Sequence, residues 1–194
     1  MNTKSLITKI AVLLLIIQSC NSQEINLENL TFTENVNQIL KKTVYSIDKT
    51  NPFFPAMTVF ETTDNNLLIY GDVKLLNNTN DVSMQNSILF ATEANDSIIR
   101  AMLVHAIDKL NSQRILKNLE NKFGNGKIIT NRIHMLADGG KSGTINYLWE
   151  NHGITYLLNY EYTKQNEQPL EEVYLFIFKD TFRLKPMLLA SFTN

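Results

Sequence analysis

The sequence has a single cysteine, Cys20, in 194 residues. Without a second cysteine the chain cannot form an internal disulfide, and it offers no pair of thiolates for a zinc site. Histidine is almost as scarce, since only His105, His134 and His152 are present. No two of these stand at the i, i+4 spacing that places two imidazoles on one helix face, so we predict no metal site.

The sequence also has no strong excess of either positive or negative charge. The formal net charge is -1 at pH 7, and removal of residues 1–19, which hold Lys4, Lys9 and no acid, would leave -3. Nucleic-acid-binding domains usually carry a clustered basic face, so we expect no nucleic-acid partner. A hydrophobic content of 44% with 19% charged residues predicts a folded, weakly anionic globular domain.

The apolar run near the N-terminus is too short to span a membrane. Ile10–Ile17 is an unbroken apolar stretch, and its eight residues rise about 12 Å in a helix, against the roughly 30 Å hydrocarbon core of a bilayer. Lys4 and Lys9 lie on its N-terminal side, and the small residue Ser19 follows it. This pattern is typical of a secretory signal peptide, which we place at residues 1–19.

The four residues Ile17-Gln18-Ser19-Cys20 end this segment. They resemble the lipobox of bacterial lipoproteins, in which a branched apolar residue, a variable one and a small one precede the cysteine. The resemblance implies diacylglyceryl transfer to the Cys20 sulfur and cleavage before Cys20. The expected partner is therefore a bacterial membrane, outer or inner, with residues 20–30 as a polar tether and the domain in the periplasm or at the surface.

Motifs of common catalytic sites are also missing. The segment Leu136–Thr144, LADGGKSGT, resembles a phosphate-binding loop, but Met135 stands where a Walker A loop needs glycine, so we predict a loop between two strands. There is no Gly-x-Ser-x-Gly elbow. Glu171 and Glu172 point to opposite faces of a predicted strand and cannot share a substrate. We therefore predict no catalytic residue and no cofactor.

Hydrophobic periodicity predicts the elements of the first half. Apolar residues at helical spacing predict a helix over residues 34–48. A period of two after Pro55 predicts strands over 57–63, 67–76 and 83–92, the first two joined by a turn at residues 64–66. Residues 97–107 fit either a strand or a helix, and we favour a strand.

The second half has the same order of elements. A helix over residues 112–123, capped by Ser112 and ended by Gly124, is followed by strand-like segments. The predicted strands cover 127–136, 144–150, 154–163, 172–178 and 187–192. Residues 151–153, Asn-His-Gly, predict a tight hairpin turn.

These elements predict an α+β fold with antiparallel sheet packed with two helices, in a single compact domain over residues 31–194. The two helices begin roughly 75–80 residues apart, so a tandem α-β4 repeat with halves 31–107 and 108–194 is one alternative. The element order resembles that of BamE-like outer-membrane lipoproteins and of domains like the beta-lactamase inhibitory protein.

Aromatic residues gather on one predicted hairpin, at Trp149, Tyr156, Tyr160 and Tyr162. The three tyrosines share one strand face. That face either packs on the helix over 112–123 or forms a partner-binding surface, since Tyr and Trp are frequent anchors of interfaces.

The function expected from these patterns is a membrane-anchored, non-catalytic module that binds an envelope protein through a sheet face or edge. An inhibitor or immunity-type protein of the envelope is a second hypothesis. A lipid or small-ligand binder is a third, and it would require a concave pocket in the fold.

Overall fold

The fold is taken from a computed structural model that describes residues 26–77, 85–136, 139–165 and 168–193. The predicted signal peptide, the lipobox and Cys20 lie outside the described residues.

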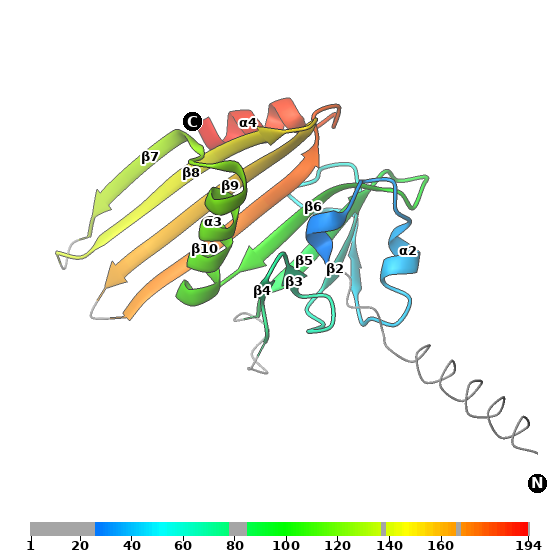
Figure 1. The fold of residues 1–194 in the computed structure, drawn as a ribbon, viewed down its shortest axis with the longest axis horizontal. Helices are drawn as coiled ribbons and strands as arrows, with labels where there is room; N and C mark the ends of the chain where they lie inside the picture. The colour runs from blue at the N-terminus through cyan, green and yellow to red at the C-terminus, as the bar shows by residue number, and fades with distance from the viewer. Residues whose placement is uncertain (1–25, 78–84, 137–138, 166–167, 194) are drawn as a thin grey trace, which may run out of the picture.

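One eight-stranded antiparallel sheet forms the centre of the molecule (Figure 1). Its order is β1-β2-β5-β6-β10-β9-β8-β7, so each long strand of the second half pairs with a sequence neighbour and β6 pairs with β10. The predicted α+β class with antiparallel sheet is confirmed. The strands are β1 (Ser46–Asp48), β2 (Thr58–Thr62), β5 (Ser87–Thr92), β6 (Ile99–Ala106), β7 (Lys127–Met135), β8 (Lys141–Asn151), β9 (Ile154–Gln165) and β10 (Gln168–Lys179).

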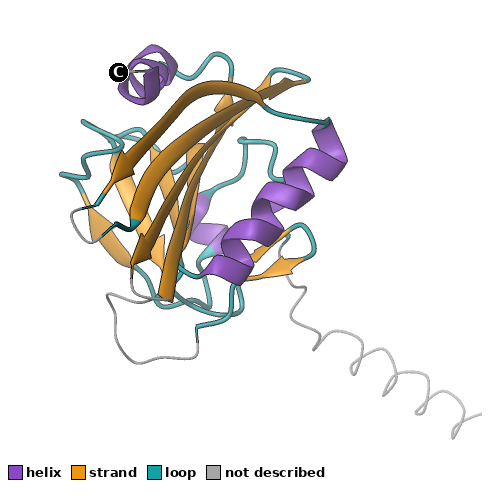
Figure 2. Ribbon diagram, turned by 90° about the vertical axis from the view of Figure 1, so that its left-hand side faces the viewer, coloured by secondary structure: helices purple, strands orange, loops and turns teal. Residues whose placement is uncertain are grey.

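Both faces of the sheet are covered, by different elements (Figure 2). The first face packs under α3 (Lys109–Phe123) and the N-terminal segment, and the second packs under α4 (Lys185–Thr193) and the loop that holds Phe53 and Phe54. The central strand β6 contributes Val104 to the first face and Leu103 to the second. Because both faces of β6 are buried, its sequence lacks polar alternation, and the preferred strand assignment for residues 97–107 is confirmed.

Helix α3 has the amphipathic pattern that the sequence predicted. Ile115 and Leu119 are fully buried against the sheet, and the helix ends at Gly124, whose φ of 76° suits glycine. Its N-cap is Asp108, which accepts a hydrogen bond from the Asn111 N–H at 2.8 Å. The prediction of Ser112 as the cap was wrong, because Ser112 is the fourth residue of α3 and its buried hydroxyl donates to the Ala106 and Glu171 carbonyls.

The predicted strand over residues 187–192 is wrong, because this segment forms α4 and gives the fold a third helix. Pro186 is the second residue of α4, where its missing N–H breaks no hydrogen bond inside the helix. Leu188 is buried, and the Phe192 ring packs at a tilt against Phe176, with ring centroids 5.3 Å apart. The apolar run therefore covers the second face of the sheet as a helix.

The predicted helix over residues 34–48 is also largely wrong. The helix α2 spans only Val36–Ile39, and Ser46–Asp48 forms the edge strand β1 beside β2. Val44 is 84% exposed, so it cannot belong to a buried helical stripe. Thr43, Val44 and Ile47 are β-branched, which favours extended backbone once packing no longer supports the helix.

The predicted strand over residues 67–76 is a small separate hairpin, β3 (Ile69–Tyr70) and β4 (Val73–Lys74). Gly71 makes the turn with a φ of 62°. The predicted hairpin at residues 64–66 does not join sheet neighbours, since β2 pairs with β1 and β5. Asn26, in the expected tether, bonds Gly71 through its side chain at 3.1 Å and 3.2 Å, just before the short 3-10 helix η1 (Leu27–Asn29).

The predicted turn at residues 151–153 is confirmed. His152, with a φ of 49°, and Gly153, with a φ of 77°, form the turn between β8 and β9. The glycine-rich segment after Met135 joins β7 to β8 as expected, but β8 already begins at Lys141, so the last four residues of the predicted loop Leu136–Thr144 lie in a strand.

Candidate functional site

Two of the four predicted binding-face residues lie beneath α3. Trp149 is 5% exposed and Tyr156 is 6% exposed. The Trp149 Nε1–H donates to the Gly124 carbonyl at 2.8 Å, and the Tyr156 ring lies 4.7 Å from that of Phe123. These contacts are those of the helix-packing alternative.

The other two tyrosines lie further along β9 and are half-buried. The Tyr160 hydroxyl donates to the Glu171 carboxylate, which also accepts from Gln113 of α3 at 3.0 Å. Burial, and then this hydrogen bond, raise the pKa of Tyr160. Tyr162 lies beyond this network, next to Gly143.

Strand β7 is one of the two edges of the sheet. Within the described ranges, it has a strand neighbour on one side only, which is β8. Every side chain of β7 is exposed or half-exposed, including the large apolar Ile128 (54%), Ile133 (59%) and Met135 (68%). Nine residues make it long for an edge. A long edge strand with exposed apolar side chains is a template for pairing with another strand.

One row of side chains connects this edge to the predicted aromatic face. The register places Ile133 opposite Gly143, and Gly143 opposite Tyr162. A Cβ added at Gly143 would lie 2.6 Å from the Tyr162 hydroxyl oxygen, so only glycine lets this ring lie across β8. We call Ile133, Met135 and Tyr162 the β7 surface. It lies on the face that α3 covers elsewhere.

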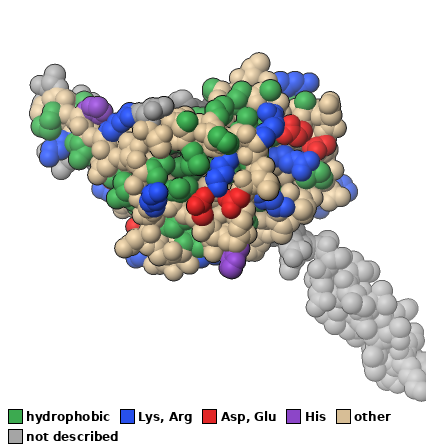
Figure 3. Space-filling model, turned by 90° about the horizontal axis from the view of Figure 1, so that it is seen from above, with side chains coloured by type: hydrophobic (Ala, Val, Ile, Leu, Met, Phe, Trp, Pro, Cys, Tyr) green, Lys and Arg blue, Asp and Glu red, His purple; other side chains and the backbone are tan. Residues whose placement is uncertain are grey.

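The edge strand is basic. Lys127, Arg132 and His134 stand on β7, and the strand contains no acidic residue. Figure 3 shows hydrophobic, basic and histidine side chains at the projecting end of the sheet, on the left of the view. An extended segment with acidic side chains would complement this edge in both backbone pairing and charge.

The three histidines do not come together. His134 is exposed on β7, His152 lies in the turn, and His105 is half-buried on β6. His105 Nε2 lies 2.5 Å from Glu172 Oε1, and its ring stacks on Tyr174 with centroids 4.4 Å apart. As predicted from strand alternation, Glu172 and Glu171 lie on opposite faces, because Glu171 instead contacts α3.

A pocket of about 490 Å³ opens beside His105. Tyr45 and Val44 form its apolar rim, and Glu61 contributes a carboxylate. Across β10 from this pocket, Glu161 stands opposite Glu172. No group of three or more potential metal ligands occurs in the part of the chain that the structure describes.

Removing the charge of Glu172 and that of Glu161, which face each other, is expected to have opposite effects on stability. Hydrogen bonding to His105 lowers the pKa of Glu172, so its ionisation stabilises the fold above pH 4.5, and this contribution is lost as the pH falls through the folded-state value. Burial and then Glu172 raise the pKa of Glu161, so its ionisation destabilises the fold until acid protonates it. We expect Glu172→Gln to lower the free energy of unfolding at pH 7 by about 1.5–3 kcal/mol, and Glu161→Gln to raise it.

Urea unfolding at pH 7 and pH 3 checks this pair. Both differences from wild type should shrink as the pH falls, and that of Glu161 first, because its raised pKa protonates its carboxyl before the lowered pKa of Glu172 is reached. Effects of the same sign at pH 7 would contradict the assigned environments.

Sequence reasoning missed the β7 surface. The exposed Ile133 and Met135 were expected in a strand, but which strand ends the sheet depends on pairings between distant segments. The signal that was available is Gly143, next to a segment rich in aromatic residues, because a glycine inside a strand marks a close approach of another group.

Within the described ranges, no helix is long and apolar enough to cross a membrane. No protein-family model matches the chain, and neither a curated protein nor a solved structure matches it.

Proposed function

We propose that this protein is a lipid-anchored lipoprotein of the bacterial envelope that binds another envelope protein without catalysis of its own. The β7 edge and the β7 surface are the binding site, and an extended acidic segment of the partner adds a strand beside β7. The lipid on Cys20 would hold this edge near the membrane, where tethering raises the local concentration of the partner.

The observation that carries this proposal is the exposure of β7. Its apolar side chains, Ile133 and Met135, are more than half exposed, whereas the edge strand at the other end of the sheet, β1, has only three residues. Strand addition supplies affinity through main-chain hydrogen bonds and specificity through the flanking side chains. Tyr162 beside Gly143 would provide an aromatic contact next to the new strand.

Charge favours a different partner over a second copy of this chain. Two antiparallel β7 strands would bring Lys127, Arg132 and His134 of each copy together without any acidic residue of β7 to compensate. Lysine and arginine on edge strands are a common means of preventing such self-pairing. An acidic strand meets no such repulsion.

We expect Ile133→Lys to reduce capture of the partner about tenfold or more, because the new ammonium would be desolvated at the interface. The matched control is Ile47→Lys, which places the same change on the other edge strand at a residue 54% exposed. The lipidated proteins are isolated from their own envelope after mild crosslinking, and the crosslinked species are quantified.

A protein that is lost with Ile133→Lys and kept with Ile47→Lys would support the edge as the site. A crosslinked homodimer would instead make the occupant a second copy. Equal capture of the partner by wild type, Ile133→Lys and Ile47→Lys would overturn the β7 assignment.

The finer architecture is also part of this proposal. We infer a tandem of two α-β4 units, one with α2 and β1, β2, β5 and β6, the other with α3 and β7–β10. The mirrored order around the β6–β10 pair supports it, since each unit contributes its last strand to the centre of the sheet. Such a tandem agrees with the element order that suggested BamE-like and inhibitory-protein-like domains. The inhibitor and small-ligand hypotheses remain alternatives that the identity of the captured partner would separate.

A further inference from the structure

Three basic side chains from separate segments line one pocket, away from the β7 surface. The pocket has a volume of about 390 Å³ and is lined by Arg100 of β6, Lys179 at the end of β10, and Arg183 in the loop before α4. Thr181 adds a hydroxyl, and Phe32 and Phe182, which are otherwise buried, add apolar surface.

The pocket is positive although the chain is weakly anionic. Three cations line it against one carboxylate, that of Glu93, which gives a formal charge of +2. Asp96 lies beside the pocket and pairs with Arg100 at 2.5 Å. Even with Asp96 included, the cations outnumber the acids.

Both arginines have N–H groups that make no hydrogen bond to the described residues. Arg183 bonds Glu93 through Nε at 2.9 Å and the Ala56 carbonyl through one terminal nitrogen at 3.3 Å. Arg100 bonds Asp96 through one terminal nitrogen, and its Nε–H is buried without an acceptor among the described residues. The Lys179 ammonium has no hydrogen-bond or ion-pair partner among the described residues. Each cation therefore has donors left for a ligand.

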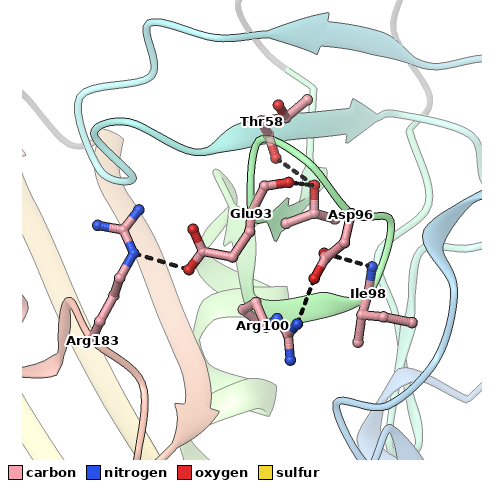
Figure 4. Close-up of polar contacts among 7 residues, drawn as sticks. Thr58, Glu93, Asp96, Ile98, Arg100 and Arg183 are labelled. Carbon is pink, nitrogen blue, oxygen red and sulfur yellow. Dashed lines mark hydrogen bonds and ion pairs between the residues drawn. The ribbon is translucent and has the colours of Figure 1, made fainter.

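Glu93 lies between the two guanidinium groups (Figure 4). Its carboxylate bonds Arg183, and its side chain is 38% exposed. An internal carboxylate in this position competes with any external oxyanion for the same donors. The backbone holds the site in place, since Asp96 also accepts from the Ile98 N–H at 3.0 Å.

We propose that this pocket binds a phosphate ester. Guanidinium groups bind phosphate through paired N–H donors, and a nearby ammonium adds charge. A volume of about 390 Å³ lies within the usual range for small-ligand sites, so it accommodates an organic group on the phosphate. Phe32 and Phe182 would contact that group. The ester is either a soluble monoester or the headgroup of a phospholipid, and the site does not depend on the β7 proposal.

The test is calorimetric titration of the full chain in detergent micelles with glycerol 3-phosphate, and separately with dihexanoyl phosphatidylglycerol. We expect Lys179→Gln and Arg183→Gln to weaken binding about tenfold or more, because each removes a charge-assisted contact. Glu93→Gln should tighten binding, because it removes the competing carboxylate. The matched control Lys42→Gln removes an exposed lysine elsewhere and should change nothing.

Tighter binding of the monoester would make the ligand a soluble phosphate ester, and tighter binding of the lipid would make it a headgroup. Either result with the expected order of variants supports the site. No saturable binding of either probe by wild type and by Glu93→Gln, or equal loss with Lys42→Gln, would overturn it. Melting curves for each variant separate loss of binding from loss of fold.

Discussion

Replacing Trp149 with alanine is expected to lower the free energy of unfolding by about 3–5 kcal/mol, the usual cost of deleting a large buried aromatic side chain. The indole is 5% exposed and stacks on Tyr147 with ring centroids 5.7 Å apart. It also lies against Gly126, where an added Cβ would come within 2.5 Å of Trp149 Cζ2. The truncation would leave a cavity between β8 and the segment after α3.

Trp149→Phe is the matched variant, since it keeps one aromatic ring and removes part of the indole together with the Nε1–H that donates to the Gly124 carbonyl. We expect it to cost about 1 kcal/mol for the hydrogen bond, plus a smaller cavity than alanine leaves. Urea unfolding followed by circular dichroism measures both. A negligible change for alanine would contradict the burial of Trp149 and return it to the partner-binding alternative.

The sequence predicted β7 to β10 well, because these strands are long and alternate regularly. β9 carries Tyr156 and Leu158 on one face and Leu157 on the other, and the turn at His152 and Gly153 pairs it with β8. These features depend on neighbours close in sequence. Local pattern therefore determined both the strand type and the pairing.

The first half and the C-terminal segment were harder to predict, for a physical reason. The apolar residues at 36–47 have helical spacing, but of these only Val36 and Leu40 are buried, and the chain then forms the edge strand β1. For residues 187–192, an apolar run fits a strand or a helix equally well. Contact with Phe176 on the second face of the sheet favours the helix, and the local sequence gives no sign of this contact.

The candidate site likewise has a part that local sequence pattern predicts and a part that depends on long-range contacts. Sequence alone placed Tyr162 on a candidate face, but not the exposed edge beside it, because the sheet order β8-β7 and the absence of a described strand beyond β7 are long-range results. The pocket proposed to bind phosphate unites Arg100 of β6 with Lys179 and Arg183, which lie at the end of β10 and just after it. No motif spacing could have joined them.

Replacing Cys20 with alanine is expected to abolish lipid labelling of the protein and to leave an uncleaved or mislocalised precursor. Alanine has no nucleophile to form the thioether, and the sequence contains no second cysteine to replace it. A single acyl chain gives only marginal membrane binding, so the proposed anchoring would depend on the two or three chains that a lipidated N-terminal cysteine carries. Metabolic labelling with an alkyne fatty acid and fractionation of the envelope measure both effects.

The control for this prediction is Asn21→Ala, which changes the next residue and should keep the label. Continued labelling of Cys20→Ala would contradict the lipobox assignment. The variant also separates anchoring from recognition, because the β7 edge lies in a part of the chain that does not include Cys20. We expect full-length Cys20→Ala to bind an isolated partner as wild type does and to lose capture in the envelope, since only the tether's contribution to local concentration is removed. Loss of binding to the isolated partner as well would mean that residues near the lipid take part in the interface.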